Sequence, residues 1–217
     1  MLAAMIIVTV LVIGVHIAAC AKENIKVRTW TKPFLVPLMG LTFFFALNRF
    51  GMTLQAWPAV LAALACYTIG DILLIPKERV SLFRAGMCFF ALGHISFTGL
   101  FISCGMSGIA LLIWAVIWIS AFAFLFSPQL DWNDRETKYN AAYAVMVMLF
   151  GIAVGGSTFD GNAWGRVAAC IGVIIFALSD SFVLYGQKKK TDMSAPVMVT
   201  YISAVALLLV SAFTLAS

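Results

Sequence analysis

Long apolar runs, separated by charged or proline- and glycine-rich breaks, are the feature that most restricts how this chain can fold. There are eight such runs: 1–21, 33–48, 57–75, 82–104, 107–126, 139–156, 164–185 and 195–216. An α-helix needs about 20 apolar residues to cross a bilayer, because each residue adds roughly 1.5 Å of length. The pattern therefore predicts an all-α membrane protein, a polytopic bundle of about eight transmembrane helices.

Composition agrees with this prediction and limits the domain count. Of 217 residues, 63% are hydrophobic and 11% are charged, whereas soluble domains carry about 25% charged residues. Eight crossings leave only short loops, so we expect a single transmembrane helical domain over residues 1–217. The run 33–48 is the shortest and contains Pro33 and Pro37. We expect this helix to be kinked or to span the membrane only in part.

Basic residues are distributed unevenly between the loops. Those near the loops after odd-numbered runs are Lys22, Lys26, Arg28, Lys32, Lys77, Arg79, Arg84, Arg135, Lys138, Lys188, Lys189 and Lys190. The loops after even-numbered runs hold only Arg49 and Arg166. Cytoplasmic loops are enriched in Lys and Arg, so we expect a multi-pass cell-membrane protein with these odd loops in the cytoplasm and both termini outside. The same assignment explains the net charge of +5 without a nucleic-acid partner.

The sequence offers no pattern for a metal or a cofactor. All five cysteines stand in apolar runs and none forms a CxxC pair, which gives no support to a metal or disulfide framework. Nucleophilic serine motifs, glycine-rich phosphate loops and metal-spaced histidines are also lacking. We therefore expect no cofactor and no metal.

Two of the nine acidic residues, Asp71 and Asp180, stand inside apolar runs. Asp71 is six residues from Lys77 and Asp180 is eight from Lys188, so each lies roughly 9–12 Å inside the cytoplasmic boundary. An ionisable residue at membrane depth costs about 2.5–3.5 kcal/mol on insertion scales and marks a functional-site hypothesis. The alternative is that each is a neutral hydrogen-bonding residue in a helix interface.

Further polar residues occur in the same half of the membrane. Lys32, Tyr143 and Tyr201 lie near the cytoplasmic ends of their helices, and His94 lies roughly 15 Å deep, near the midplane. Together with Asp71 they predict one polar cavity that opens toward the cytoplasmic leaflet. In the alternative reading Lys32 is a topology charge, both tyrosines belong to an interfacial belt, and His94 bonds a neighbouring carbonyl.

The two segments that contain the aspartates resemble each other. "IGDILLIPKER" and "LSDSFVLYGQKKK" each have a small residue, Asp, an apolar turn and then a basic loop, and they stand four helices apart. This similarity raises the hypothesis of a 4+4 repeat, with an axis along the membrane normal and the two carboxyl groups at the centre.

The ordered motifs of the chain resemble those of the YhhN-like family of membrane proteins, which includes the lysoplasmalogenases. They are "TKP" at 31–33, "GDILL" at 70–74, "FRAGMCFFALGHISF" at 83–97, "YNAAYAVMVM" at 139–148, "IFALSDSFVL" at 175–184 and "TYISA" at 200–204. The chain departs from the family after Tyr201, where Ile202 follows and Val205 stands at the position where the family often has glutamine.

The resemblance implies a lysoplasmalogenase, an ether-bond hydrolase that cleaves the vinyl-ether bond of lysoplasmalogen. The products are a fatty aldehyde and glycerophosphoethanolamine or glycerophosphocholine, and the partners are a lysophospholipid substrate and membrane lipid. Metal-free acid–base catalysis by Asp71 and Asp180 suits this reaction. One carboxyl protonates the alkenyl group while the other, ionised, stabilises the cation and deprotonates water. Lys32, His94, Tyr143 and Tyr201 are the expected substrate-binding residues.

Two other functions remain as alternatives. Membrane-embedded Asp and His also form proton relays, so a proton-coupled transporter is one alternative. Hydrolysis of another lysolipid is the second, although it normally needs an activated nucleophile or a metal. A transporter requires polar access from both faces, whereas the outer halves of these runs are nearly all apolar. This difference favours the lipid hydrolase.

Overall fold

The computed structural model describes residues 1–76, 79–130, 132, 134 and 136–216, most of them helical. Its α-helices are α1 (Leu2–Ala21), α2 (Ile25–Phe50), α3 (Trp57–Leu73), α4 (Val80–Ser103), α5 (Gly108–Ala121), α6 (Thr137–Gly156), α7 (Ala163–Lys189) and α8 (Ser194–Phe213). A π-helical turn, Phe122–Phe126, and a 3-10 turn, Ser127–Gln129, follow α5, and a second 3-10 turn, Phe159–Gly161, precedes α7. Each of the eight predicted segments is confirmed as a helix within the described residues.

Of the two expectations for the second helix, a kink or a partial span, the partial span is wrong. Helix α2 has 26 residues and continues through Pro33 and Pro37. It begins eight residues before the predicted run because Asn24 caps it, accepting a hydrogen bond from the amide of Val27 at 3.2 Å. Proline is tolerated within membrane helices when neighbouring groups satisfy the freed carbonyls. Lys32 consequently lies inside the helix and not at its start.

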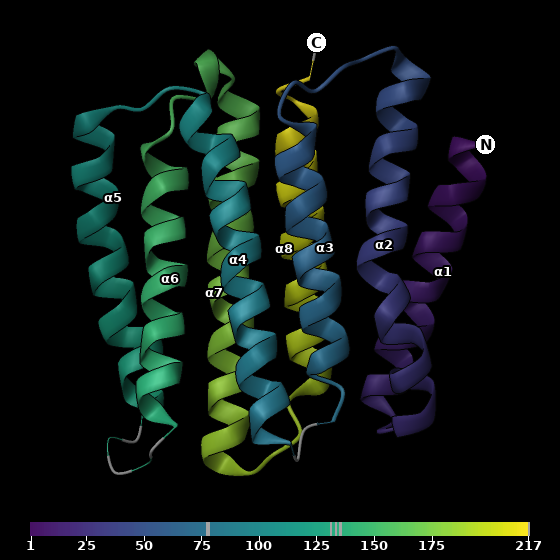
Figure 1. Ribbon diagram of the computed structural model, residues 1–217, viewed down its shortest axis with the longest axis vertical. Coiled ribbons are helices and arrows are strands. Elements are labelled where there is room, and N and C mark those ends of the chain that lie inside the picture. Colours follow the sequence, from purple (N-terminus) through teal and green to yellow (C-terminus); the bar gives the residue numbers. More distant parts are fainter. Residues whose placement is uncertain (77–78, 131, 133, 135, 217) are drawn as a thin grey trace.

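Two helical hairpins, α3–α4 and α7–α8, face each other at the centre of the bundle, with α1–α2 on one side and α5–α6 on the other (Figure 1). Helix α2 packs on α3 and α8, and α6 packs on α7 and α4. Exchanging each helix for the one four places later reproduces these contacts. A 4+4 repeat predicts this packing, although the contact between α1 and α8 has no counterpart of similar extent between α5 and α4.

Aromatic side chains fill the space between the two central hairpins. Tyr67 of α3 stacks on Phe90 of α4, with ring centroids 5.5 Å apart, and Phe176 of α7 lies 5.5 Å from Tyr67. His94 and Phe97 complete this cluster, and both are fully buried. Gly93 makes the packing possible, because a Cβ there would lie 2.4 Å from the Tyr67 ring. Small residues permit such close approach between membrane helices.

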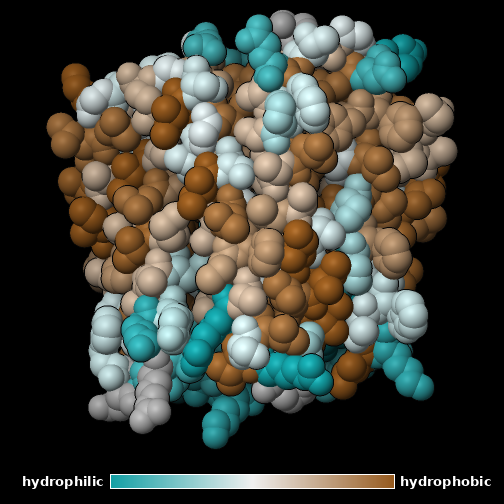
Figure 2. Space-filling model, viewed as in Figure 1, coloured by the Kyte–Doolittle hydropathy of each residue, from teal (hydrophilic) through white to brown (hydrophobic). Residues whose placement is uncertain are grey.

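The outer surface has the properties of a membrane protein. In the described part of the chain, seven helices are long and apolar enough to cross a bilayer, counting α5 together with its following turns, and α3 is an apolar helix of 17 residues. Figure 2 shows a largely hydrophobic belt between two hydrophilic ends. The loops after α1, α3, α5 and α7 meet at one end, hereafter the basic end, and both termini lie toward the other (Figure 1). Lys77 and Arg135, two of its expected basic residues, lie outside the described residues.

An ion pair ties two segments together at the basic end. The Arg84 guanidinium donates hydrogen bonds to the Glu136 carboxylate at 2.8 and 2.5 Å. These bonds hold the pKa of the Glu136 carboxyl below its usual value. Because both side chains are partly exposed, the pair contributes little to stability and chiefly fixes the start of α6 beside α4.

The contact between α5 and α6 yields a stability prediction. A Cβ at Gly151 would lie 2.0 Å from the Trp118 ring, whereas one at Gly14 would meet nothing within 4 Å. We expect Gly151→Ala to destabilise the protein by about 1–3 kcal/mol, because the buried indole must move. Gly14→Ala should be neutral or slightly stabilising, since alanine favours the helix. Thermal unfolding in detergent measures both, and equal midpoints would contradict the predicted difference.

Candidate active site

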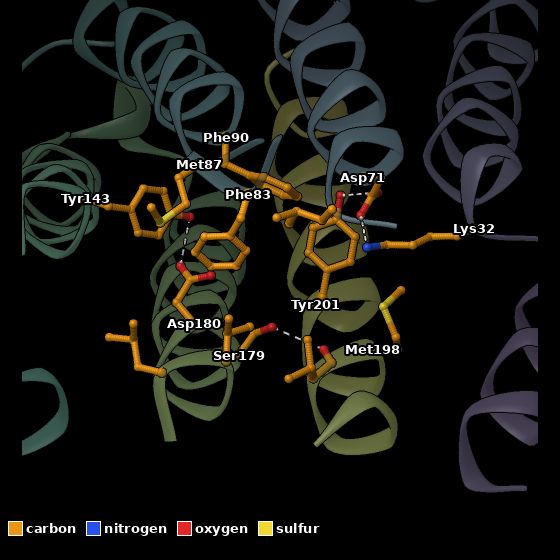
Figure 3. A pocket seen from close by; sticks show the side chains of 14 residues that line it. Lys32, Asp71, Phe83, Met87, Phe90, Tyr143, Ser179, Asp180, Met198 and Tyr201 are labelled. Atoms are coloured by element: carbon orange, nitrogen blue, oxygen red, sulfur yellow. Dashed lines mark hydrogen bonds and ion pairs between the residues drawn. The ribbon is translucent and has the colours of Figure 1, made fainter. Parts of the chain in front are cut away.

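A pocket lies between the central hairpins in the half of the bundle nearer the basic end; the space without atoms there is about 560 Å³, open solvent included. The lining residues come from α2, α3, α4, α6, α7 and α8. They are Lys32, Asp71, Leu74, Phe83, Met87, Phe90, Tyr143, Ser179, Asp180, Val183, Leu184, Val197, Met198 and Tyr201 (Figure 3). Five of the six residues singled out in the sequence, all except His94, are thus in the wall of one pocket.

Asp71 of α3 is the more enclosed carboxyl group, with 2% of the residue exposed. Its Oδ1 lies 3.4 Å from the Lys32 ammonium of α2, and its Oδ2 accepts a hydrogen bond of 2.9 Å from the Tyr201 hydroxyl of α8. Both oxygens therefore have a donor, and one donor is a cation. Such surroundings stabilise a carboxylate.

Asp180 of α7 lies on the other side of the pocket and is partly exposed to it (Figure 3). Its Oδ2 accepts a hydrogen bond of 3.2 Å from the Tyr143 hydroxyl of α6. Among the described residues, no cation pairs with Asp180 and no hydrogen bond reaches its Oδ1. Among the described residues, the two carboxyl groups share no hydrogen bond. Each accepts a hydrogen bond from a different tyrosine, and only Asp71 forms an ion pair with a lysine.

His94 does not line the pocket, contrary to the expectation that it binds the substrate. The residue is fully buried one layer behind Tyr143. Its Nε2 lies 3.3 Å from the Tyr143 hydroxyl, and its Nδ1 lies 2.9 Å from the Tyr67 hydroxyl. It also stacks on Phe150, with centroids 4.9 Å apart. His94 is thus an aromatic residue of the core, and its contact with the Tyr143 hydroxyl connects it to the pocket.

Tyr67 is a polar residue of this network that the sequence analysis missed. It is fully buried, and it stands one helical turn before Asp71 on α3. That spacing of four residues places both side chains on one face of the helix. The signal was therefore present in the sequence, but a tyrosine in an apolar run also suits core packing.

Ser179 also lines the pocket. The Ser179 hydroxyl donates to the Val197 carbonyl at 3.1 Å, which links α7 to α8 beside the pocket. Across the described residues, no group of three or more His, Cys, Asp or Glu side chains is arranged to hold a metal ion. The groups available in the pocket for proton transfer and charge stabilisation are therefore two carboxyls, one ammonium and two phenols.

Comparison with known protein families matches residues 27–212 to the YhhN family, which is most of the chain. The chain belongs to the YhhN family. The matched range includes every polar residue of the pocket in this YhhN protein, from Lys32 to Tyr201. Comparisons with curated proteins and with solved structures gave no match.

Proposed function

We propose that this YhhN protein is a membrane-embedded lysoplasmalogenase. It hydrolyses the vinyl-ether bond of lysoplasmalogen to a fatty aldehyde and glycerophosphoethanolamine or glycerophosphocholine. The observation that carries the proposal is the placement of Asp71 and Asp180 in one pocket with different partners. Vinyl-ether hydrolysis needs a proton donor and, later, a negative group beside an oxocarbenium ion, and two unlike carboxyls supply both.

The shape of the site suits a single-chain lipid. The pocket walls are mostly aliphatic and aromatic, which favours an alkenyl chain, and Lys32 offers a positive charge on the side of the basic end. Arg28, near the start of α2, is a further cation at that end, where its charge is shared with Asp192 at 2.9 Å. A lysolipid lying in the adjacent leaflet can place its headgroup near these cations and its vinyl-ether bond between the carboxyls.

The buried aromatic cluster supports an enzyme over a proton-coupled transporter. Tyr67, His94, Phe97 and Phe176 stand between the pocket and the opposite end of the bundle, and each is less than 2% exposed. The hydrogen bonds that lead from the pocket stop at Tyr67. Within the described residues, no hydrogen bond continues this chain toward the opposite end, whereas a transporter needs polar access from both faces.

Assay of the purified protein in detergent tests the proposed function. With a lysoplasmalogen as substrate we expect stoichiometric release of free aldehyde and the glycerophospho-headgroup. The matched control is the 1-O-alkyl lysolipid, which has the same headgroup and a saturated ether. It should remain intact, because it cannot form the oxocarbenium ion by protonation. Absence of aldehyde from the alkenyl substrate would contradict the proposal, and cleavage of a lysolipid ester instead would indicate a different hydrolase.

The membrane orientation is a second prediction. We propose that the basic end faces the cytoplasm and that both termini lie outside, because the basic loops follow odd-numbered helices. Reporter fusions after Arg79 and after Lys189 should be cytoplasmic, and a fusion at Ser217 should not. A cytoplasmic reporter at the C-terminus would overturn this orientation.

A further inference from the structure

The two carboxyl groups of the pocket differ in the charge around them. Asp71 has the Lys32 ammonium at 3.4 Å and the Tyr201 hydroxyl at 2.9 Å, so a negative charge on it is matched by a cation and a donor. Among the described residues, Asp180 has only the Tyr143 hydroxyl as a hydrogen-bond partner, at 3.2 Å, and its neighbours in the wall include Val183 and Leu184. An apolar environment without a cation favours a neutral carboxylic acid.

The chain of hydrogen bonds behind Asp180 has a preferred direction. The two contacts of the His94 ring, with Tyr67 and with Tyr143, allow two directions. In the first, Tyr67 donates to Nδ1 of His94, Nε2–H of His94 donates to the Tyr143 oxygen, and Tyr143 donates to Oδ2 of Asp180. In this direction each hydroxyl and ring proton has an acceptor. The reverse direction would leave the Tyr67 hydroxyl proton without an acceptor among the described residues. Leaving such a buried donor unpaired is costly.

The direction of this relay determines which oxygen of Asp180 carries a proton. Because Oδ2 already accepts the Tyr143 hydroxyl, an acidic proton on Asp180 belongs on Oδ1. That oxygen has no protein partner among the described residues, and the side chain lines the pocket. The proton is thereby presented to the substrate, and the carboxylate that remains after transfer keeps the Tyr143 hydrogen bond.

We propose that Asp180 is the acid that protonates the alkenyl group, that Asp71 is the ionised base, and that Tyr67, His94 and Tyr143 form a relay that orients Asp180. The inference rests on the proposed lysoplasmalogenase function and adds the assignment of each carboxyl. Tyr67 and His94 are positioning residues in this assignment, since they act only through Tyr143.

The assigned roles give a balanced reaction. The proton on Oδ1 of Asp180 passes to the alkenyl carbon that is not bonded to oxygen, using the electron pair of the double bond. The neighbouring carbon becomes an oxocarbenium ion. Water adds to this carbon and gives one proton to the Asp71 carboxylate. The product of this addition is a hemiacetal. In the collapse, the hemiacetal hydroxyl returns a proton to Asp180 while Asp71 protonates the departing glycerol oxygen. Both carboxyls are restored, and one water is consumed per aldehyde.

Azide distinguishes the acid from the base. In Asp71→Ala the alkenyl group can still be protonated by Asp180, and the unpaired Lys32 ammonium attracts an anion into the vacated space. Azide needs no base in order to attack the oxocarbenium ion. We expect azide to restore substrate consumption by this variant at least tenfold, with an azido-ether adduct detected by mass spectrometry. The same concentration should not rescue Asp180→Ala, which lacks the proton donor.

The outcomes separate the role assignment from the function. Azide rescue of Asp180→Ala, or no rescue of Asp71→Ala, would overturn the assignment while wild-type aldehyde release still supports the hydrolase. An inactive wild-type protein would overturn the function itself. Both alanine variants must retain the elution profile of the folded protein in detergent. If Asp71→Ala does not, Asp71→Ser, which also shortens the side chain and leaves space for azide, replaces it with the same expectations.

The relay is tested by removing one hydroxyl at a time. Tyr67→Phe should lower kcat about threefold to tenfold with KM unchanged, because Tyr143 loses its support. In a Tyr143→Phe background the same change should have no further effect, since the relay no longer reaches Asp180. Tyr185→Phe is the matched control, because Tyr185 lies on α7, is 38% exposed and does not line the pocket. Additive losses, or an unchanged kcat in Tyr67→Phe, would contradict the relay.

Discussion

Asparagine at position 71 or 180 is expected to reduce aldehyde release by about 10²- to 10⁴-fold, which is the contribution of a general acid or base. Asparagine is nearly isosteric with aspartate and still accepts the hydrogen bond from Tyr201 or Tyr143. It supplies neither an acidic proton nor a negative charge. Because the two carboxyls act in one reaction sequence, the double variant should be little worse than either single variant.

The two asparagine variants should differ in stability. Asp180→Asn removes a carboxyl that has no cation partner among the described residues, so the thermal midpoint should stay close to that of the wild type. Asp71→Asn leaves the Lys32 ammonium without its counter-ion and should unfold at a lower temperature. Asp160→Asn is the matched control for both assays. Asp160 is exposed, lies at the opposite end, and has a φ of 48° that asparagine also accepts. Near-normal turnover by either pocket variant would exclude the two-carboxylate mechanism.

The helical segments could be predicted from the sequence because the bilayer imposes a simple length requirement on each apolar run. The error at α2 came from treating Pro33 and Pro37 as the start of a helix. The residues before them, from Ile25 onward, are polar enough to resemble a loop. Their polar side chains are accommodated at the basic end, where Arg28 pairs with Asp192. Hydropathy alone does not separate such a helical end from a loop.

The placement of Asp71 and Asp180 in the same half of the bundle was also predictable, because 1.5 Å per residue converts the distance to a basic loop into depth, and both line one pocket. Their partners were not. Tyr201 is 130 residues from Asp71, and Tyr143 is 37 residues from Asp180. These pairs depend on how the helices rotate and pack, which is determined by contacts such as Tyr67 against Gly93. The sequence did not indicate that each carboxyl would have a separate tyrosine.

Lys32→Met is expected to reduce activity by at least about 10²-fold, although Lys32 touches neither reacting carbon in the proposed mechanism. The Lys32 ammonium is the only cation paired with Asp71 among the described residues, at 3.4 Å. Removing one partner of a buried ion pair costs about 3–5 kcal/mol, because the remaining charge stays desolvated. Without Lys32, the Asp71 carboxylate avoids this cost by taking up a proton. A protonated Asp71 cannot accept a proton from water, so the variant lacks its base.

A charge-neutral double variant separates this pairing from a topology role for Lys32. Lys32→Met with Asp71→Asn has no unpaired charge, so we expect it to unfold at a higher temperature than Lys32→Met alone while remaining inactive. Lys26→Met is the matched control. Lys26 lies six residues earlier on α2 and is exposed, and its replacement removes the same charge from the basic end. It should keep both activity and stability. If Lys32→Met behaves like Lys26→Met in both assays, Lys32 acts only as a topology charge, and Asp71 must be held ionised by Tyr201 alone.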